Sequence, residues 1–276
     1  MTDFSERTVL VTGGGTGIGK GCAEHFLARG AIVTIAGPDG EVLASAATEL
    51  RQSTGRDAVR TAVCDVTDED TVRHAVDVAA EEGRLDVCIA NAGTGFPGPV
   101  QLLEKAHWHI PFDVNVVGTA LCIKHSARLM KQADSGACLR AIVAISSVDA
   151  VRANRFMPTY NVTKAAVDSL VAASARELAR FGIRVNGVRP GLVMTDTIRQ
   201  VLPEGMRQNE VSRTYLGRAG TPEDIARAVA FLASEDASWI TGQMLNVCGG
   251  LSVHDGDDFE PLARLAFGDS LIDDLG

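Results

Sequence analysis

Short apolar runs alternate with longer stretches in which apolar residues recur at helical spacing over most of the chain. The runs have the length of buried strands, and the longer stretches have the pattern of helices with one buried face. The expected strands are residues 9–12, 31–36, 59–64, 86–90, 140–145, 184–187 and 243–247. This alternation predicts an α/β fold, a doubly wound seven-stranded parallel sheet with helices on both faces.

Helices are expected after the first strand, at 41–50, and at two long stretches, 108–130 and 160–181. Pro111 costs the first long helix a backbone hydrogen bond unless it lies in the first turn, so the start of this helix is left open. Residues 67–70, Thr-Asp-Glu-Asp, resemble a capping box that opens a helix to about residue 82. Residues 221–224, Thr-Pro-Glu-Asp, place a cap, a proline and an acid at the start of a helix to about residue 234.

The 276 residues suit one large domain, with 46% apolar and 22% charged residues. A net charge of −9 without a cluster of Lys and Arg disfavours nucleic acid as a partner. The N-terminus has no secretory pattern, and no apolar run approaches the ~18 residues that would span a membrane. We therefore expect a cytoplasmic protein with no membrane partner. Six cysteines without a Cys-x-x-Cys pair favour buried thiols over disulfides or zinc.

The first strand runs directly into a glycine-rich stretch, Thr12-Gly13-Gly14-Gly15-Thr16-Gly17-Ile18-Gly19. Glycines allow a ligand close to the main chain, and the following helix offers unpaired N–H groups and positive potential to a phosphate. The pattern is Thr-Gly-x-x-x-Gly-x-Gly and does not match Gly-x-Gly-x-x-Gly in any frame. It predicts a site for the pyrophosphate of a dinucleotide; the alternative is a turn that only joins strand to helix.

Tyr160 and Lys164 are four residues apart, so on a helix both side chains lie on one face. A phenol titrates near pH ~10, and a cation nearby can lower its pKa by roughly 1–3 units, toward that of a useful general base. Ser147 ends an apolar strand, where its hydroxyl could hydrogen-bond a carbonyl oxygen that gains charge. Taken alone, Tyr-x-x-x-Lys is more often a surface pair.

Together these pieces resemble the short-chain dehydrogenase/reductase family over about residues 6–253, a single Rossmann-type domain. The resemblance implies that Tyr160 is the acid/base, that Ser147 orients the substrate oxygen, and that Lys164 binds the nicotinamide ribose and tunes Tyr160. Asn115 would hold a water in a proton relay. The implied residues around the cofactor are Gly13, Gly15, Thr16, Gly17, Ile18, Gly19, Gly37, Asp65, Val66, Asn91, Ala92, Gly93, Tyr160, Lys164, Pro190, Gly191, Val193 and Thr195.

Two positions depart from the family pattern. Ala90 stands where an Asn often precedes Asn-Ala-Gly, and Cys248 stands where Asp is usual near the last strand. Neither change affects the residues expected to do chemistry.

His107 and His109 are two apart, which suits a metal site on a strand, but their segment is expected to be helical and no metal is predicted. His25, His74, His125 and His254 are expected on the surface.

The resemblance implies hydride transfer between NAD(P)(H) and a carbonyl or secondary alcohol. The alternative is a regulatory protein that senses dinucleotide; a sensor would not need the four catalytic residues together. Residues 195–216 are expected to form a lid over the substrate, and residues 254–276 an acidic tail. Apolar residues near the site predict a hydrophobic substrate, such as a 3-oxoacyl or steroid-like ketone: Phe96, Phe156, Met157, Leu192 and Met194. Arg152 and Arg155 could meet an acidic group or be solvated.

The end of the second strand bears on cofactor choice. An acid there binds the adenine-ribose hydroxyl of NAD, whereas an Arg nearby accommodates the extra phosphate of NADP. Gly37 occupies the position of the acid, and Asp39 lies two residues further along. We therefore predict a mild preference for NADP(H). The family resemblance and the small residues of the two long helices further predict a homotetramer, or a homodimer.

Overall fold

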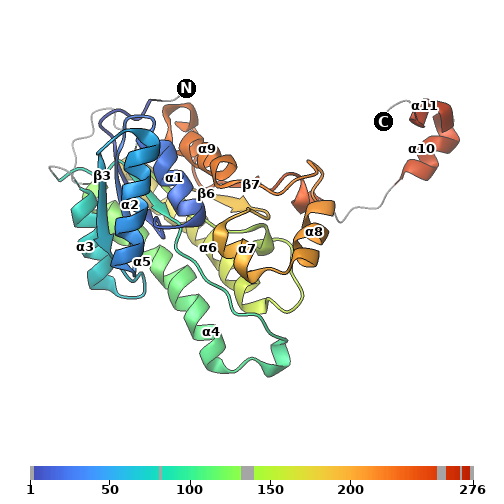
Figure 1. Ribbon diagram of the computed structural model, residues 1–276, viewed down its shortest axis with the longest axis horizontal. Helices are drawn as coiled ribbons and strands as arrows, with labels where there is room; N and C mark the ends of the chain where they lie inside the picture. The colour runs from blue at the N-terminus through green and yellow to red at the C-terminus, as the bar shows by residue number, and fades with distance from the viewer. Residues whose placement is uncertain (1–2, 81–82, 132–139, 254–258, 268, 274–276) are drawn as a thin grey trace.

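The computed structural model describes residues 3–80, 83–131, 140–253, 259–267 and 269–273. Within them, seven strands form one parallel sheet in the order β3-β2-β1-β4-β5-β6-β7 (Figure 1). The strands are β1 (Thr8–Thr12), β2 (Ile32–Gly37), β3 (Val59–Val63), β4 (Val87–Ala90), β5 (Arg140–Ile145), β6 (Ile183–Pro190) and β7 (Met244–Val247). The predicted fold class is confirmed, and β6 is longer than its apolar run because its last residues still pair with β7.

The chain reverses its direction across the sheet between β1 and β4. β1 pairs with β2 on one side and with β4 on the other, so the connections leave the two strands in opposite directions. In open α/β sheets the crevice beyond the carboxyl ends of such strands is where ligands bind. The turn after β1 and the loop after β4 therefore lie at the expected place for a site.

The helices cover both faces of the sheet. They are α1 (Gly17–Leu27), α2 (Gly40–Thr54), α3 (Glu69–Ala79), α4 (Lys105–Pro111), α5 (Gly118–Met130), α6 (Pro158–Leu178), α7 (Asp196–Val201), α8 (Glu204–Ser212), α9 (Pro222–Ala233), α10 (Glu260–Phe267) and α11 (Asp269–Asp273). One core cluster joins the sheet to α1, α2 and α9, and a second joins it to α3, α5 and α6.

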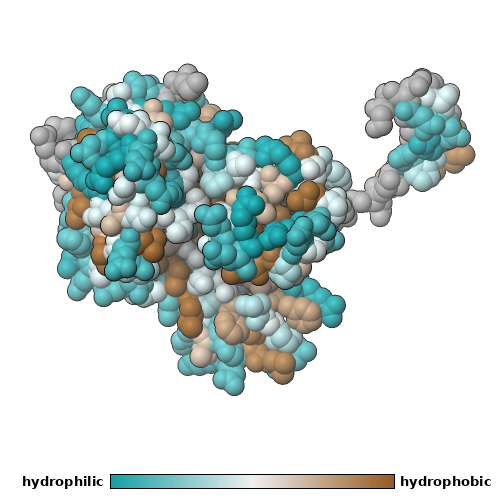
Figure 2. Space-filling model, in the orientation of Figure 1, coloured by the Kyte–Doolittle hydropathy of each residue, from teal (hydrophilic) through white to brown (hydrophobic). Residues whose placement is uncertain are grey.

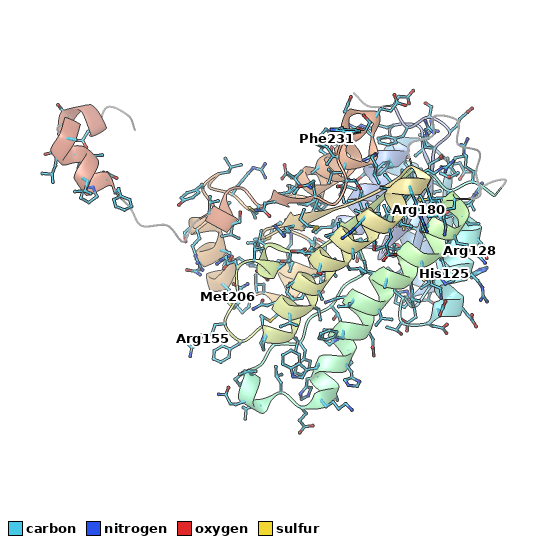
Figure 3. The ribbon with its side chains drawn as sticks, turned by 180° about the vertical axis from the view of Figure 1, so that it is seen from behind. His125, Arg128, Arg155, Arg180, Met206 and Phe231 are labelled. Atoms are coloured by element: carbon cyan, nitrogen blue, oxygen red, sulfur yellow. The ribbon has the colours of Figure 1, made fainter. Side chains whose placement is uncertain are left out.

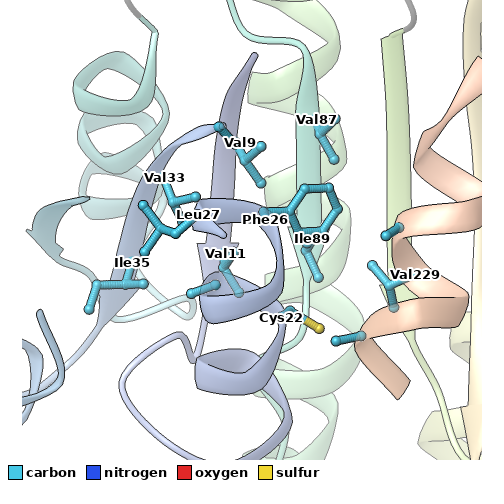
Figure 4. Close-up of a cluster of buried hydrophobic side chains, with 14 of the residues drawn as sticks. Val9, Val11, Cys22, Phe26, Leu27, Val33, Ile35, Val87, Ile89 and Val229 are labelled. Carbon is cyan, nitrogen blue, oxygen red and sulfur yellow. The ribbon is translucent and has the colours of Figure 1, made fainter. Parts of the chain in front are cut away.

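The first cluster is centred on Phe26 of α1 (Figure 4). Its fully buried ring lies against side chains of β1 and β4, including Val9 and Ile89, and meets the Phe4 ring edge-on at 4.6 Å. Val229 of α9 belongs to the same cluster. Burial of such an aromatic side chain stabilises the fold by about 1.5–3 kcal/mol. This packing fixes α1, whose first turn follows the glycine stretch.

The helix predicted at 108–130 is not one regular helix. Lys105–Pro111 is α-helical, Phe112–Val117 is a π-helix, and α5 follows at Gly118. Pro111 is the last residue of α4, so the boundary that the sequence left open is a break at this proline. A π-helix pairs each N–H with a carbonyl five residues earlier, which accommodates one extra residue and often marks a functional site.

Helix capping was predicted correctly at α9 and one residue off at α3. In α9, Thr221 and Asp224 form the expected capping box with Pro222 at the first position. In α3, Asp68 and not Thr67 is the cap, because its carboxylate accepts hydrogen bonds from the N–H groups of Asp70 and Thr71. α3 ends at Ala79, since the following residue is extended.

Two histidines expected on the surface are buried. His25 of α1 is 4% exposed, and its Nδ1 lies 3.1 Å from the Glu223 carboxylate at the start of α9. His125 of α5 is 5% exposed, and its Nε2 lies 3.0 Å from Glu69 of α3. The prediction fails because both rings sit between packed helices, where a carboxylate supplies the hydrogen-bond partner. His254 and Cys138 lie outside the described residues; the five described cysteines are free thiols.

α10 and α11 extend apart from the body of the molecule (Figure 1). Leu262 and Leu265 of α10 are 59% and 84% exposed, and Arg264 pairs with Glu260, Asp269 and Asp273 within the same segment. Among the helices that the structure describes, none has the length and apolar character needed to cross a membrane.

Candidate active site

The glycine stretch forms a tight turn between β1 and α1. Gly13 and Gly17 have φ of +62° and +52°, a region that favours glycine. A Cβ on Gly19 would lie 2.2 Å from the Gly13 carbonyl oxygen, so only glycine fits there. Thr16 caps α1 without a side-chain hydrogen bond, and the first turn of α1 carries no acidic residue. This N-terminus has the geometry and the charge that suit a phosphate.

The loop after β4 supports that turn. The Asn91 amide donates hydrogen bonds to the carbonyl oxygens of Thr12 and Gly13, at 2.9 and 3.2 Å, and its backbone N–H donates to the Thr12 hydroxyl at 3.0 Å. A Cβ on Gly93 would lie 3.2 Å from Lys164 Nζ and 3.3 Å from Asn115 Oδ1. The predicted sequence Asn91-Ala92-Gly93 therefore connects the glycine turn to the residues predicted to do chemistry.

The other predicted cofactor residues follow β2, β3 and β6. Val193 bridges to Gly220, and the Gly191 N–H donates to Val247 at 3.2 Å, next to Pro190. Thr195 caps α7, and its Cγ2 lies 3.1 Å from where a Cβ on Gly17 would be. The structure thus places the loop after β6 against the glycine turn.

Gly37 ends β2, where its carbonyl accepts from the Cys64 N–H at 2.8 Å. A Cβ on Gly37 would meet only Leu43 Cδ2, at 3.6 Å. The Asp39 carboxylate accepts from the N–H groups of Glu41 and Val42 and so caps α2. Asp65, which precedes Val66, is likewise engaged locally, accepting from the Thr67 N–H and hydroxyl.

Tyr160, Lys164 and Ser147 meet beyond the carboxyl end of β5. Lys164 Nζ donates to the Ile145 carbonyl at 2.8 Å and lies 5.5 Å from the centre of the Tyr160 ring. The Lys164 side chain is 3% exposed and Ser147 is 7% exposed. The Ser147 side chain is close enough to the Tyr160 hydroxyl to lower the pKa of the phenol. The interpretation of Tyr-x-x-x-Lys as a surface pair is therefore wrong.

The titration behaviour of the pair differs from the sequence prediction. Burial, together with the Asp149 carboxylate, raises the pKa of Tyr160 to about 12, and the Ser147 side chain acts in the opposite direction. Burial lowers the pKa of Lys164 to about 8, against the attraction of Asp168 and Asp149. The pKa of Tyr160 is thus raised and not lowered as expected, because desolvation of the phenol and the Asp149 charge both disfavour its ionised form.

Asn115 lies in the π-helix and is fully buried. Its Oδ1 accepts from the Thr94 N–H, and its Nδ2 donates to the Thr94 carbonyl and to the Thr163 hydroxyl, each at 2.8 Å. The Thr163 hydroxyl lies 3.0 Å from the Tyr160 carbonyl oxygen. Asn115 therefore ties the loop after β4 to the helix that carries Tyr160. Both amide hydrogens are used, so a water at Asn115 would have to donate to one of its oxygens.

Asp149 was not singled out from the sequence. Its backbone N–H donates to the Ser147 hydroxyl at 3.1 Å, and its carboxylate accepts from Asn154 Nδ2 at 2.9 Å. Burial raises the pKa of this carboxyl to about 6, with Arg152 opposing and Glu210 adding to the shift. Its position two residues after Ser147 was a signal, because a turn at the end of that strand keeps such a residue close.

The two arginines near the site differ. Arg152 is buried and paired with Glu210 of α8, whereas Arg155 is exposed and lies over the Phe156 ring at 4.6 Å. Among the predicted apolar residues, the Phe96 ring stacks on His107 at 4.3 Å, and Met157 Cε lies 3.2 Å from where a Cβ on Gly95 would be.

Comparison with known proteins gives the same assignment. The family model described as "Enoyl-(Acyl carrier protein) reductase" matches residues 13–252. The cis-4-hydroxycyclohexanecarboxylate dehydrogenase of Sinomonas cyclohexanicum is 41% identical over 250 residues, which are 90% of this chain and 97% of that protein.

Solved structures agree in fold. A short-chain type dehydrogenase/reductase from Mycobacterium ulcerans has a TM-score of 0.86 at 39% identity, covering 97% of this chain and 98% of that chain. The 3-ketoacyl-(acyl-carrier-protein) reductase from Brucella melitensis, complexed with NADH, has a TM-score of 0.83 at 31% identity, covering 91% and 100%.

These relatives are named as dehydrogenases and reductases, and none supports a dinucleotide-sensing regulator. The matched region includes both the glycine turn and the Tyr160–Lys164 pair. The chain therefore belongs to the short-chain dehydrogenase/reductase family and is an NAD(P)-dependent oxidoreductase that transfers hydride between its cofactor and a carbonyl or alcohol.

Proposed function

We propose that the chain interconverts a secondary alcohol and a ketone on a hydrophobic substrate with a saturated ring. The grouping of Ser147, Tyr160 and Lys164 at one sheet end carries the reaction type. A substrate that contains a saturated ring is supported by the 41% identity to an enzyme named for a hydroxycyclohexanecarboxylate. Apolar side chains beside Tyr160, including Met157, suit such a substrate.

The residues present fit a dinucleotide. The Gly13 and Gly19 positions leave no room for a side chain, so a pyrophosphate could approach the main chain there, at the start of α1. Thr195 and Val193 would meet the carboxamide, Lys164 the nicotinamide ribose, and Asp65 and Val66 the adenine. When bound, the nicotinamide gives or accepts the hydride.

The protein residues manage the proton. In reduction, Tyr160 donates its hydroxyl proton to the substrate oxygen, and in oxidation it accepts the alcohol proton. Its raised pKa favours the protonated acid. Ser147 donates a hydrogen bond to the same oxygen as charge develops there. Lys164 holds a positive charge below the ring, and Asn115 provides the route for a water to return the proton.

NADP(H) is the proposed preferred cofactor. Gly37 places no carboxylate at the end of β2, and an added phosphate meets no repulsion from that position. The Asp39 carboxylate supports this proposal, because it accepts two N–H groups at the start of α2 and is thereby held to its own helix.

We further propose that the protein is cytoplasmic and forms a homotetramer or a homodimer. Each chain would have one catalytic domain (residues 1–253), with a lid at about residues 195–216, and a C-terminal tail. α5 and α6 lie side by side across one exposed face, where Arg128 and Arg180 stand (Figure 3). Hydrophobic surface also lies around α4 (Figure 2), where Leu102 and Ile110 are 71% and 60% exposed. Such patches are typical of subunit contacts.

The test is a panel of alcohols and ketones assayed with NAD(H) and NADP(H). It includes 4-hydroxycyclohexane derivatives, a hydroxysteroid and a 3-oxoacyl thioester, with Tyr160→Phe as the blank. Turnover of the cyclohexane compounds above the others is expected. Activity only with an acyclic substrate would refute the proposal that the substrate contains a saturated ring. No turnover above the blank with any compound would refute the proposed reaction type.

A further inference from the structure

The guanidinium of Arg152 is an unusual group to find beside this site. Arg152 follows directly on the turn that begins at Ser147, and its backbone N–H donates to the Val148 carbonyl at 2.9 Å. Its side chain is only 7% exposed. A buried cation needs a partner, because removing it from water costs several kcal/mol.

The partner is Glu210 of α8. Arg152 Nη1 and Nη2 donate to the two carboxylate oxygens of Glu210, at 3.2 and 3.3 Å, in a two-pronged arrangement. α8 belongs to the proposed lid and has no buried residue along its length. The cation therefore belongs to the body of the protein, whereas the carboxylate belongs to a helix that is packed loosely on it.

The Arg152–Glu210 pair acts on Asp149, whose backbone N–H donates to the hydroxyl of the catalytic Ser147 at 3.1 Å. The charges of Arg152, Glu210 and Lys164 all act on the Asp149 carboxylate, and the Asp149 charge in turn acts on Tyr160. The Asp149 carboxylate is thus within electrostatic reach of both the Arg152 guanidinium and the Tyr160 phenol. A small ring held at Tyr160 could place a substituent within reach of Arg152.

We propose that Arg152 binds a carboxylate of the substrate, and that Glu210 occupies this carboxylate position from within the chain until a substrate takes it. The inference rests on the proposed function, because it assigns the substrate class of the same site: a ring alcohol or ketone that carries a carboxylate. It agrees with the named substrate of the 41% identical relative.

Charge balance requires that the substrate replaces Glu210. Glu210 already pairs with the Arg152 guanidinium, and the Asp149 carboxylate adds a second negative charge that interacts with it, so a third carboxylate would be repelled. Arg213 lies 3.9 Å from Glu210 at the end of α8, so Glu210 keeps an ion pair when α8 moves away from Arg152. Substrate binding and lid movement are then one event.

The experiment compares cis-4-hydroxycyclohexanecarboxylate with its uncharged carboxamide, using wild type and Arg152→Gln. We expect kcat/KM to fall at least about 30-fold for the carboxylate and less than about threefold for the carboxamide, since one charge-assisted pair is lost only with the former. Arg155→Gln is the matched control, because Arg155 is an exposed arginine on the same loop (Figure 3). This substitution should leave kcat/KM unchanged for both substrates.

Glu210→Gln should have the opposite effect on turnover of the carboxylate substrate. Removal of the competing carboxylate should lower KM for the carboxylate substrate at least about threefold and leave KM for the carboxamide unchanged. An equal loss for both substrates in both variants would show that the pair only holds the lid, and would overturn the inference. Should Arg152→Gln not fold, Arg152→Lys keeps the charge without the two-pronged geometry and should give an intermediate carboxylate-specific loss.

Failure of the proposed function can be recognised separately. If wild type turns over neither cyclohexane compound, thermal unfolding with cyclohexanecarboxylate still tests Arg152. A rise in Tm that is lost in Arg152→Gln and absent with cyclohexanecarboxamide supports a carboxylate site, whereas no rise, or an equal rise in both proteins, overturns it.

Discussion

The ammonium of Lys164 donates a hydrogen bond to the carbonyl oxygen of Ile145, the last residue of β5, at 2.8 Å. This bond fixes a helical side chain to the end of a strand. It also gives a buried cation a neutral partner, so the charge of Lys164 remains available to act on groups nearby. The position of Lys164 beside Tyr160 therefore follows from the sheet as well as from the four-residue spacing.

Tyr160→Phe should abolish turnover while cofactor affinity stays within about twofold of wild type. The hydroxyl carries the proton and the ring only packs, and a general acid or base contributes roughly 10²–10⁴ in rate. The measurements are steady-state rates and fluorescence titration with the reduced cofactor. Retention of more than about a tenth of the wild-type rate would contradict the role of Tyr160.

Asp149→Asn should move the pH profile of alcohol oxidation to lower pH. Above about pH 6 the Asp149 carboxylate is charged and raises the pKa of Tyr160, which oxidation must deprotonate. Without that charge the phenol ionises more easily, so kcat/KM rises at a lower pH in the variant. Below pH 6 the two profiles should converge, since Asp149 is then neutral in wild type too. Superimposable profiles between pH 6 and 10 would refute the coupling.

Gly37→Asp should shift preference toward NAD(H) by at least about tenfold, equivalent to about 1.4 kcal/mol. The new side chain fits, because a Cβ there would make only an ordinary contact with Leu43. Titration of both reduced cofactors against wild type and variant measures the ratio. Tighter NADH binding by wild type would refute the NADP preference, and an unchanged ratio in the variant would show that the ribose lies elsewhere.

Gly19→Ala should weaken cofactor binding at least about tenfold and lower Tm, because its Cβ would overlap the Gly13 carbonyl and push the turn open. Gly205→Ala is the control: it lies in α8, where an added Cβ meets nothing within 4 Å. The control should leave both properties unchanged or raise Tm slightly. Equal behaviour of the two variants would mean that the turn has room to adjust.

Light scattering at micromolar concentration should give the mass of a tetramer or a dimer, and deletion of residues 256–276 tests the tail. α10 exposes Leu262 and Leu265, so removal of the tail should change assembly if these residues contact a second subunit. A monomeric wild-type chain would contradict the proposed assembly. Unchanged assembly and activity after deletion would show that the tail is an appendage.

The sheet could be predicted because its strands are short apolar runs bounded by turns, such as Val87–Ala90. The proximity of Tyr160 and Lys164 could be predicted from their spacing, since the two residues share a helix face. The buried state of His25 could not, because its partner Glu223 is 198 residues away. Local pattern carries no information on which distant carboxylate covers a ring.

The pKa shift of Tyr160 also could not be predicted from the sequence. From the sequence, Lys164 is the charge expected to act on Tyr160, whereas the structure adds the burial of the phenol and the carboxylate of Asp149. Both effects act against ionisation. A pKa depends on the sum of desolvation and all nearby charges, which only the folded arrangement provides.

The geometry of the π-helix at Phe112–Val117 depends on the number of residues in this segment as well as on their side chains. Loss of one codon there would let the backbone close as a regular α-helix, because the π-helix holds one residue more than the α-helix that would replace it, and the side chains of the widened turn would be presented differently. Asn115 would then leave Thr94 and Thr163, although no residue type at the site had changed. This stretch should therefore tolerate many single substitutions better than any single deletion, a property that substitution scanning does not sample.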